Sequence, residues 1–184
     1  MANDRLPEPG EAVVGLKLAA DTARRLLDGA QLLAAGQHYG PARSLAVLAF
    51  EESVKARTLA HMADPGEDGV IFSEDVLKKI IFSGHVERHD TGFYQQMVSQ
   101  YPAALFAALA GLKVEADDVK AVAEWSALKD SANADKMAGF YTDFYPSTSK
   151  WRAPAEVSQA EFEMTYKLAK EFQDATEGTI KNFG

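Results

Sequence analysis

The sequence PARSLAVLAFEESVKARTLAHMA, residues 41–63, predicts the helix around which the rest of the chain packs. Pro41 suits the first turn of a helix, because the N–H that proline lacks would have no intrahelical partner there. Apolar side chains recur with helical spacing on one side, and further apolar residues cover the other side: Leu45, Leu48, Ala49, Ala56, Leu59 and Ala60, then Val47, Phe50, Val54 and Met62. A helix that is apolar on nearly every side belongs in the middle of a bundle.

Further helices are predicted on both sides of this central helix. Apolar residues keep a helical spacing from about residue 11 to Gly36, where glycine suits a helix end. Ser158 and Glu161 form a capping box, which is typical of a helix start, so the last helix begins there. The remaining predicted helices cover residues 73–89, 102–112 and 116–138.

These elements predict a single domain. Residues 1–10 carry two prolines and mixed charges without periodicity, which indicates a flexible leader. Residues 11–184 then form one helical domain. Residues 140–154 are aromatic and β-branched and contain two prolines, so we expect an irregular aromatic loop before the last helix. The fold class is therefore predicted to be all-α, a bundle of about five to six helices.

Composition excludes several functional classes. With 19 basic against 27 acidic residues the net charge is −8, so any RNA contact would need a local basic cluster. The absence of cysteine excludes disulfides, thiolate metal sites and a cysteine nucleophile, and it fits a reducing compartment. The sequence begins without a signal peptide, and no apolar run approaches the roughly 18 residues of a membrane span. We therefore expect a cytoplasmic protein with no membrane partner.

Charged residues interrupt the central helix where its apolar stripe should be buried. Glu52 falls between Leu48 and Ala56 on that stripe, and a lone carboxylate in the protein interior would be costly. Glu51 precedes Lys55 by four residues and Glu52 precedes it by three, which are the spacings of helical ion pairs. The three charged side chains fan over about 100° of one helix face.

The predicted helix at residues 73–89 supplies partners for these charges. One of its stripes holds Leu77, Ile81, His85 and Arg88. Because the first two are typical core residues, the imidazole and the guanidinium should point into the protein or into a cleft. We therefore expect a polar cluster between two packed helices, made of Glu51, Glu52, Lys55, His85 and Arg88.

Three interpretations of this cluster remain open. It is a buried ion-pair network that fixes how the helices cross. Alternatively, it is a catalytic site in which His85 is the acid or base and Arg88 or Lys55 binds a phosphate, as metal-independent RNA cleavage requires. The third is a metal site on His85 and His89, which is disfavoured because the Glu-x-x-His pattern of di-iron bundles is absent. We expect no metal and no cofactor, since nucleotide-binding loops are also absent.

Three stretches of the sequence resemble motifs of the AbiV family of bacterial abortive infection proteins, in the HEPN-like superfamily. GQHYGPA at residues 36–42, with LAFEESVKA at 48–56, resembles its Gly-x-Tyr-x-x-Ala followed by Ala-x-Glu-Glu-x-x-Lys-Ala. FSGHVER at 82–88 resembles its Phe-x-x-His-x-x-Lys, with Arg88 in place of lysine. KMAGFYTD at 136–143 resembles its Lys-x-x-Gly-Leu-Tyr-Val-Asp.

The resemblance implies a HEPN-like helical bundle that acts inside the cell during phage infection. It implies binding to a phage or host protein, with RNA as an alternative partner, and arrest of host processes such as translation. HEPN-like proteins often form homodimers, so a homodimer is expected. The resemblance also implies that Lys136, Tyr141 and Asp143 join the binding residues. In the alternative, Lys136 and Asp143 pair with each other and only anchor the aromatic loop.

The sequence departs from the pattern of HEPN ribonucleases, which is arginine, four to six residues, then histidine. Only three residues separate Arg57 from His61, and His85 precedes Arg88. Two functions therefore stay open. The first is a defence protein that binds its target through the polar cluster, and the second is a metal-independent endoribonuclease with His85 and Arg88 as catalytic residues.

Overall fold

A computed structural model of the chain describes residues 5–64, 72–82, 84–110, 112–145 and 149–183. The fold is all-α, with seven α-helices and one short β-hairpin in the described ranges. The elements are α1 (Pro9–Ala35), α2 (Tyr39–Ala63), α3 (Glu74–Phe82), α4 (His85–Gln100), α5 (Pro102–Leu109), α6 (Ala116–Phe140), β1 (Asp143–Tyr145), β2 (Lys150–Arg152), the 3-10 turns η1 (Pro154–Glu156) and η2 (Lys181–Phe183), and α7 (Gln159–Ile180).

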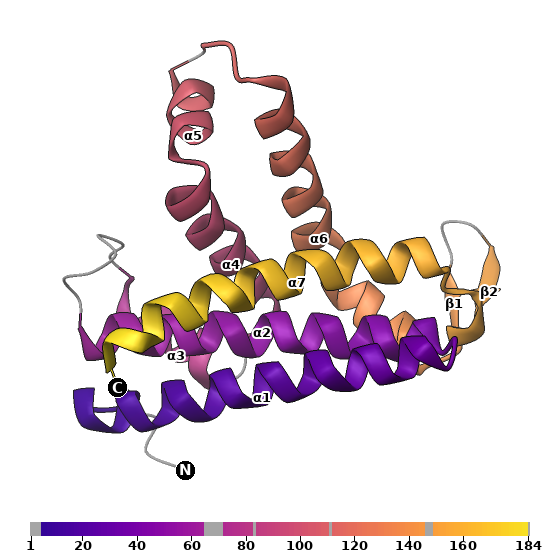
Figure 1. Cartoon of the computed structure of the whole chain (residues 1–184), viewed down its shortest axis with the longest axis horizontal. Helices are drawn as coiled ribbons and strands as arrows, with labels where there is room; N and C mark the ends of the chain where they lie inside the picture. Colours follow the sequence, from indigo (N-terminus) through magenta and orange to yellow (C-terminus); the bar gives the residue numbers. More distant parts are fainter. Residues whose placement is uncertain (1–4, 65–71, 83, 111, 146–148, 184) are drawn as a thin grey trace.

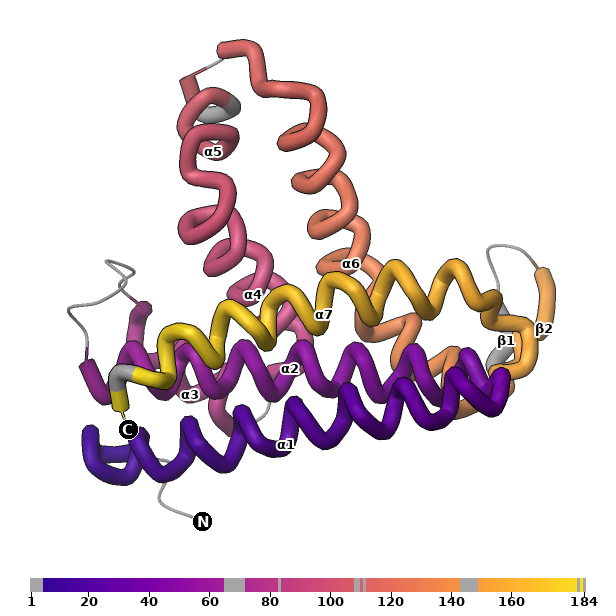
Figure 2. Tube along the Cα trace, in the orientation of Figure 1, coloured from indigo at the N-terminus to yellow at the C-terminus, as the bar shows by residue number. Residues whose placement is uncertain are grey.

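Three long helices that lie side by side form the base of the molecule. Helices α1, α2 and α7 make this layer, and α4, α5 and the first part of α6 rise from it as a projecting arm (Figure 1). The hairpin of β1 and β2 lies at one end of the layer, and the C-terminus lies at the other (Figure 2). The two strands are antiparallel, with Phe144 opposite Trp151.

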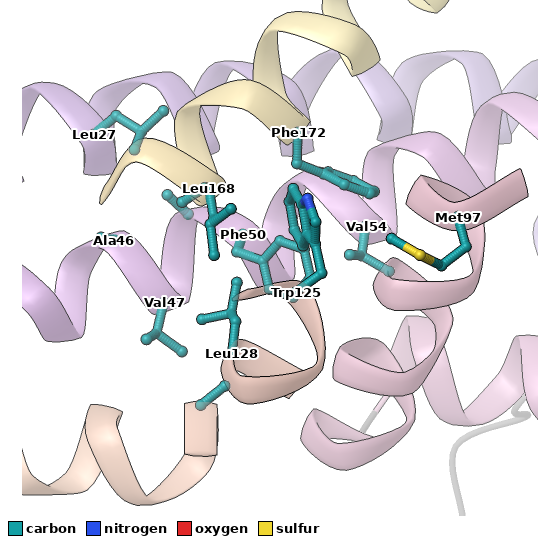
Figure 3. Close-up of a cluster of buried hydrophobic side chains, with 13 residues drawn as sticks. Leu27, Ala46, Val47, Phe50, Val54, Met97, Trp125, Leu128, Leu168 and Phe172 are labelled. Carbon is teal, nitrogen blue, oxygen red and sulfur yellow. The ribbon is translucent and has the colours of Figure 1, made fainter. Parts of the chain in front are cut away.

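Helix α2 is the centre of the fold, as its sequence predicts. It contacts α1, α7, α6, α4, α3 and η1. Phe50 of α2 lies 5.2 Å from the ring of Phe172 and 5.9 Å from that of Trp125, so three helices meet in one aromatic group (Figure 3). Tilted and edge-on pairs of this kind contribute about 0.5–1.5 kcal/mol beyond the area that they bury. This group fixes the position of α6 and α7 against α2.

The ends of the first and last helices follow local signals. α1 begins at Pro9, inside the stretch predicted as leader, because Glu8 and Glu11 form a capping box. It ends before Gly36, and Gln37 takes the left-handed φ of 62° that turns the chain into α2. The capping box of α7 is confirmed: the Ser158 backbone N–H donates to Glu161 at 2.8 Å, and the Glu161 N–H donates back to the Ser158 hydroxyl.

The single helix predicted at residues 73–89 is wrong, because the chain breaks there into α3 and α4. Gly84 is the N-cap of α4, and a Cβ at this position would lie 2.6 Å from the Glu87 carboxylate and 2.9 Å from the Lys79 carbonyl. The break therefore needs glycine. Within α3 the buried residue is Ile80, whereas Leu77 and Ile81, which the prediction placed in the core, are half-buried.

Candidate functional site

A buried carboxylate on α2 gathers side chains from α4 and α6. Glu51 is 1% exposed, and its Oε1 accepts hydrogen bonds from His89 Nε2 at 3.0 Å and from Lys136 Nζ at 2.9 Å. Its Oε2 lies 2.6 Å from His85 Nδ1 and 3.7 Å from the Arg88 guanidinium. We call these five residues the Glu51 cluster. Because a carboxylate only accepts, each imidazole nitrogen that faces Glu51 carries a hydrogen.

These donors keep Glu51 charged. Burial acts to raise the pKa of Glu51, but hydrogen bonds from His89, Lys136 and His85 outweigh it and lower the pKa from 4.5 to about 2. An ionised carboxylate in the interior is tolerated only when paired in this way. The cluster therefore holds a fixed negative charge beside the cationic groups of Lys136 and Arg88.

The Arg88 guanidinium donates hydrogen bonds to the backbone of α3. Its Nε donates to the Ile80 carbonyl at 2.7 Å, and a terminal nitrogen donates to the Ile81 carbonyl at 3.4 Å. These are carbonyls of the last turn of α3, which lack partners within their own helix. The side chain is buried, so Arg88 ties the end of α3 to the start of α4. This placement gives it a positioning role.

His85 is where the Glu51 cluster reaches the surface. Its side chain is 51% exposed, whereas His89, Arg88 and Lys136 are buried. Its Nδ1 faces Glu51, so the other ring nitrogen, Nε2, lies on the opposite edge of the imidazole. A carboxylate that accepts from one ring nitrogen fixes the tautomer and leaves the second nitrogen available for a ligand or a proton. His85 can thus act as an oriented acid, base or hydrogen-bonding group.

Glu52 and Lys55 lie apart from the cluster, contrary to the expected single site. Lys55 Nζ donates to Glu52 Oε1 at 2.9 Å, and both side chains are half-buried. They line a groove of about 390 Å³ between α1, α2 and α3, together with Leu18, Leu59 and Phe82 among others. Neighbouring helix positions differ by 100°, so Glu51 turns towards α4 and α6 while Glu52 turns towards α1. Glu51 is the buried carboxylate, and the burial expected for Glu52 is wrong.

The last motif contributes Lys136 to the cluster. The partner that the structure gives Lys136 is Glu51, 85 residues away in sequence. Gly139 explains how α6 comes so close, because a Cβ there would lie 2.0 Å from the Ser44 hydroxyl and 2.2 Å from the Gly40 carbonyl. Tyr141 is exposed.

Asp143 begins β1, where its backbone is paired with Arg152. Its side chain lies outside the described residues. The structure therefore places only the backbone of this predicted binding residue.

His89 is the member of the cluster that the site prediction missed. The signal was present, because His89 follows His85 by four residues and shares its helix face. In the described ranges no group of three or more histidine, aspartate and glutamate side chains is placed to hold a metal ion. Both oxygens of Glu51 already accept N–H hydrogen bonds. The two histidines therefore act as hydrogen-bond donors to the Glu51 carboxylate.

A second buried network connects α2, α6 and α7. Arg43 donates to Asp135 at 2.6 Å and to the Thr165 hydroxyl at 3.1 Å, and Ser131 donates to the same Asp135 oxygen. Arg43 and Asp135 are both buried. Sequence reasoning did not single out either residue, because no local pattern connects positions 92 residues apart.

Comparison with known proteins places the chain in a family. The model of the HEPN AbiV family, described as AbiV, matches residues 11–174. Comparison with curated proteins and with solved structures gave no significant match. None of the helices in the described ranges combines the length and apolarity needed to cross a bilayer. The match covers most of the chain and all of the motifs quoted above, and it supports a role in phage defence. The chain therefore belongs to the AbiV family of abortive infection proteins, in the HEPN-like superfamily.

Proposed function

We propose that this protein acts in the bacterial cytoplasm during phage infection by binding a phage or host component over His85, and that binding arrests host processes such as translation. The observation that supports this proposal is the contrast between His85 and the groups beneath it. His85 is half exposed, and its ring is held by Glu51, which is 1% exposed. A rigidly oriented polar group at the surface loses little entropy on binding.

The charges of the Glu51 cluster indicate the chemistry of the partner. One carboxylate, Glu51, faces the cationic side chains of Lys136 and Arg88. The buried part of the cluster therefore carries a surplus of positive charge beneath the His85 ring. Such a field favours an anionic group, a carboxylate or a phosphate, as the group that meets His85.

A metal-independent endoribonuclease is the second candidate, and the pair of Glu51 and His85 favours it. A carboxylate on Nδ1 leaves Nε2 to take the proton of a ribose 2′-hydroxyl and to return a proton to the leaving oxygen. Arg88 is bonded to the Ile80 and Ile81 carbonyls. The enzyme hypothesis therefore depends on His85 as the reacting group, with Arg88 as the residue that holds α4 in place.

Infection assays with two variants test the binding proposal. In cells challenged with phage, His85→Ala should lose protection while its melting temperature stays within a few degrees of the wild type, because His85 is half exposed. Glu52→Gln is the control and should protect fully, since the partner of Glu52 among the described residues is Lys55, at the surface groove. Full protection by His85→Ala would overturn the proposal.

Purified protein separates the two candidates. Wild type and His85→Ala are incubated with total RNA in the presence of a chelator. Cleavage by the wild type that His85→Ala abolishes supports the endoribonuclease. Intact RNA with the wild type, together with loss of protection in His85→Ala cells, supports binding without cleavage.

A further inference from the structure

The outer face of α1 carries an exposed stripe that no other described helix covers. Helix α1 forms one edge of the base layer, with α2 and α7 on its other side (Figure 1). The stripe consists of Val14, Leu18, Asp21, Arg25, Asp28 and Leu32, all exposed. Their spacing of four, three, four, three and four is a heptad repeat, and it confines them to about 80° of the helix surface.

Three of these side chains are large and apolar at the surface of the protein. Val14 is 60% exposed, Leu18 is 64% and Leu32 is 76%. The face of α1 that packs into the layer is made largely of alanine and leucine, so these three are additional to the core. A line of exposed apolar residues along one helix is typical of a surface that binds another helix.

Four of the six positions of the stripe are complementary to one another when it is reversed about Ala23. Val14 and Leu32 lie nine residues on either side of this position, and Asp21 and Arg25 lie two residues on either side. We propose that this face of α1 binds the same face of a second copy in antiparallel orientation. Val14 then meets Leu32 of the other copy at both ends, and Asp21 meets Arg25 twice at the centre.

The charges fit this arrangement. Among the described residues, no carboxylate lies within ion-pair distance of Arg25. Asp21 pairs with Arg24 at 2.9 Å and remains 57% exposed, so it can accept a further donor. At the two remaining positions, Leu18 of one copy lies opposite Asp28 of the other. Sliding one copy by seven residues removes both contacts between Val14 and Leu32, so the apolar ends fix the register.

The surface beside Val14 also offers a place for Leu32 of the second copy. The groove of about 390 Å³ begins here, and its lining includes Gly15, Leu18 and Phe82. Leu32 is the most exposed of the three apolar side chains on the stripe and lies about 27 Å along the helix from Val14. The antiparallel pairing puts each Leu32 at the groove of the opposite copy, so the apolar contact is made twice.

Charge-reversal variants test the two central pairs of Asp21 with Arg25, and the measured quantity is the molar mass in solution. The wild type should have twice the 20.0 kDa mass of one chain in light scattering. Asp21→Arg and Arg25→Glu should each have the mass of one chain, because each puts like charges opposite each other twice. Mixing the two variants should restore the doubled mass, since each Arg then meets an Asp or a Glu. A single-chain mass for the wild type, or a mixture that stays single, would overturn the proposal.

Engineered thiols test the register, because the chain has no cysteine of its own. Val14→Cys mixed with Leu32→Cys should form a disulfide-linked pair under mild oxidation. Neither variant should cross-link alone, since the antiparallel pairing places equal positions about 27 Å apart. Val119→Cys mixed with Leu32→Cys is the control, because Val119 is an exposed valine of α6. Cross-linking of Val14→Cys with itself would overturn the antiparallel pairing. These readouts do not depend on phage defence.

Discussion

Nδ1 of His85 lies 2.6 Å from Oε2 of Glu51, and this contact connects a half-exposed ring to a carboxylate in the centre of the fold. Glu51 in turn accepts from His89 and Lys136, so α2, α4 and α6 share one negative charge. The orientation of the surface imidazole therefore depends on the packing of three helices. A change at Glu51 should alter both stability and the surface that His85 presents.

Replacing Glu51 with glutamine should destabilise the fold by about 3 kcal/mol. The substitution leaves the buried cation of Lys136 without its carboxylate, and breaking one partner of a buried ion pair typically costs this much. The measurement is the free energy of unfolding from urea denaturation at pH 7.

Glu52→Gln is the control for this measurement, because it makes the same chemical change one residue away. Glu52 pairs with Lys55 at the surface, and pairs of this kind contribute at most about 1 kcal/mol. Equal losses of stability in the two variants would contradict the assignment of Glu51 as the buried charge.

The sequence predicts the central helix and the last helix well, because local features determine both. Apolar residues around α2 mark it as buried, and Ser158 and Glu161 fix the start of α7. The break between α3 and α4 is different. A single glycine is tolerated inside a helical pattern, so Gly84 alone does not distinguish a continuous helix from two. The break depends on how α4 packs against α2 and α6.

The site is predicted only in part, for a related reason. Because α2 is apolar on nearly all sides, its apolar stripe points to Glu52 as the inward carboxylate, whereas Glu51 is the buried one. That choice is made by the positions of His89 and Lys136, which belong to other helices. Lys136 entered the prediction only through the family resemblance, since no periodicity connects it with α2. Tertiary packing thus decides what local patterns leave open.

Glu51 should titrate with a pKa of about 2, and its contribution to stability should follow that titration. Its pKa in the fold lies below the ordinary value of 4.5. The charged form therefore stabilises the fold above pH 4.5, and this contribution, roughly 3 kcal/mol, is lost as the pH falls from 4.5 towards 2. Carbon-13 NMR of the Glu51 carboxyl against pH measures the pKa directly. A midpoint near 4.5 would contradict the hydrogen bonds described for the cluster.

Arg88→Lys should loosen α3 although it keeps the charge. Lysine lacks the planar fork with which Arg88 reaches the Ile80 and Ile81 carbonyls. We expect a loss of about 1–2 kcal/mol and faster amide exchange in residues 74–82, with exchange in α1 unchanged. Hydrogen exchange with mass spectrometry measures both segments.

Arg24→Lys is the matched control for Arg88→Lys. Arg24 is an exposed arginine of α1 that pairs with Asp21 and Glu177 at the surface. Its replacement should change stability by less than about 0.5 kcal/mol. Unchanged exchange in residues 74–82 of Arg88→Lys would show that Arg88 does not hold the end of α3.

Gly139→Ala should disturb the Glu51 cluster from the far side of α6. The added methyl group would lie 2.2 Å from the Gly40 carbonyl, which is backbone and cannot swing aside. Helix α6 must therefore move away from α2 and carry Lys136, one turn earlier, away from Glu51. We expect a loss of about 1–3 kcal/mol from overpacking and a rise in the pKa of Glu51 as the hydrogen bond from Lys136 lengthens.

Gly178→Ala makes the same change in α7 with no atom within 4 Å, and it should stabilise the helix by up to about 1 kcal/mol. If both variants gained stability, the close approach of α6 to α2 at Gly139 would be refuted.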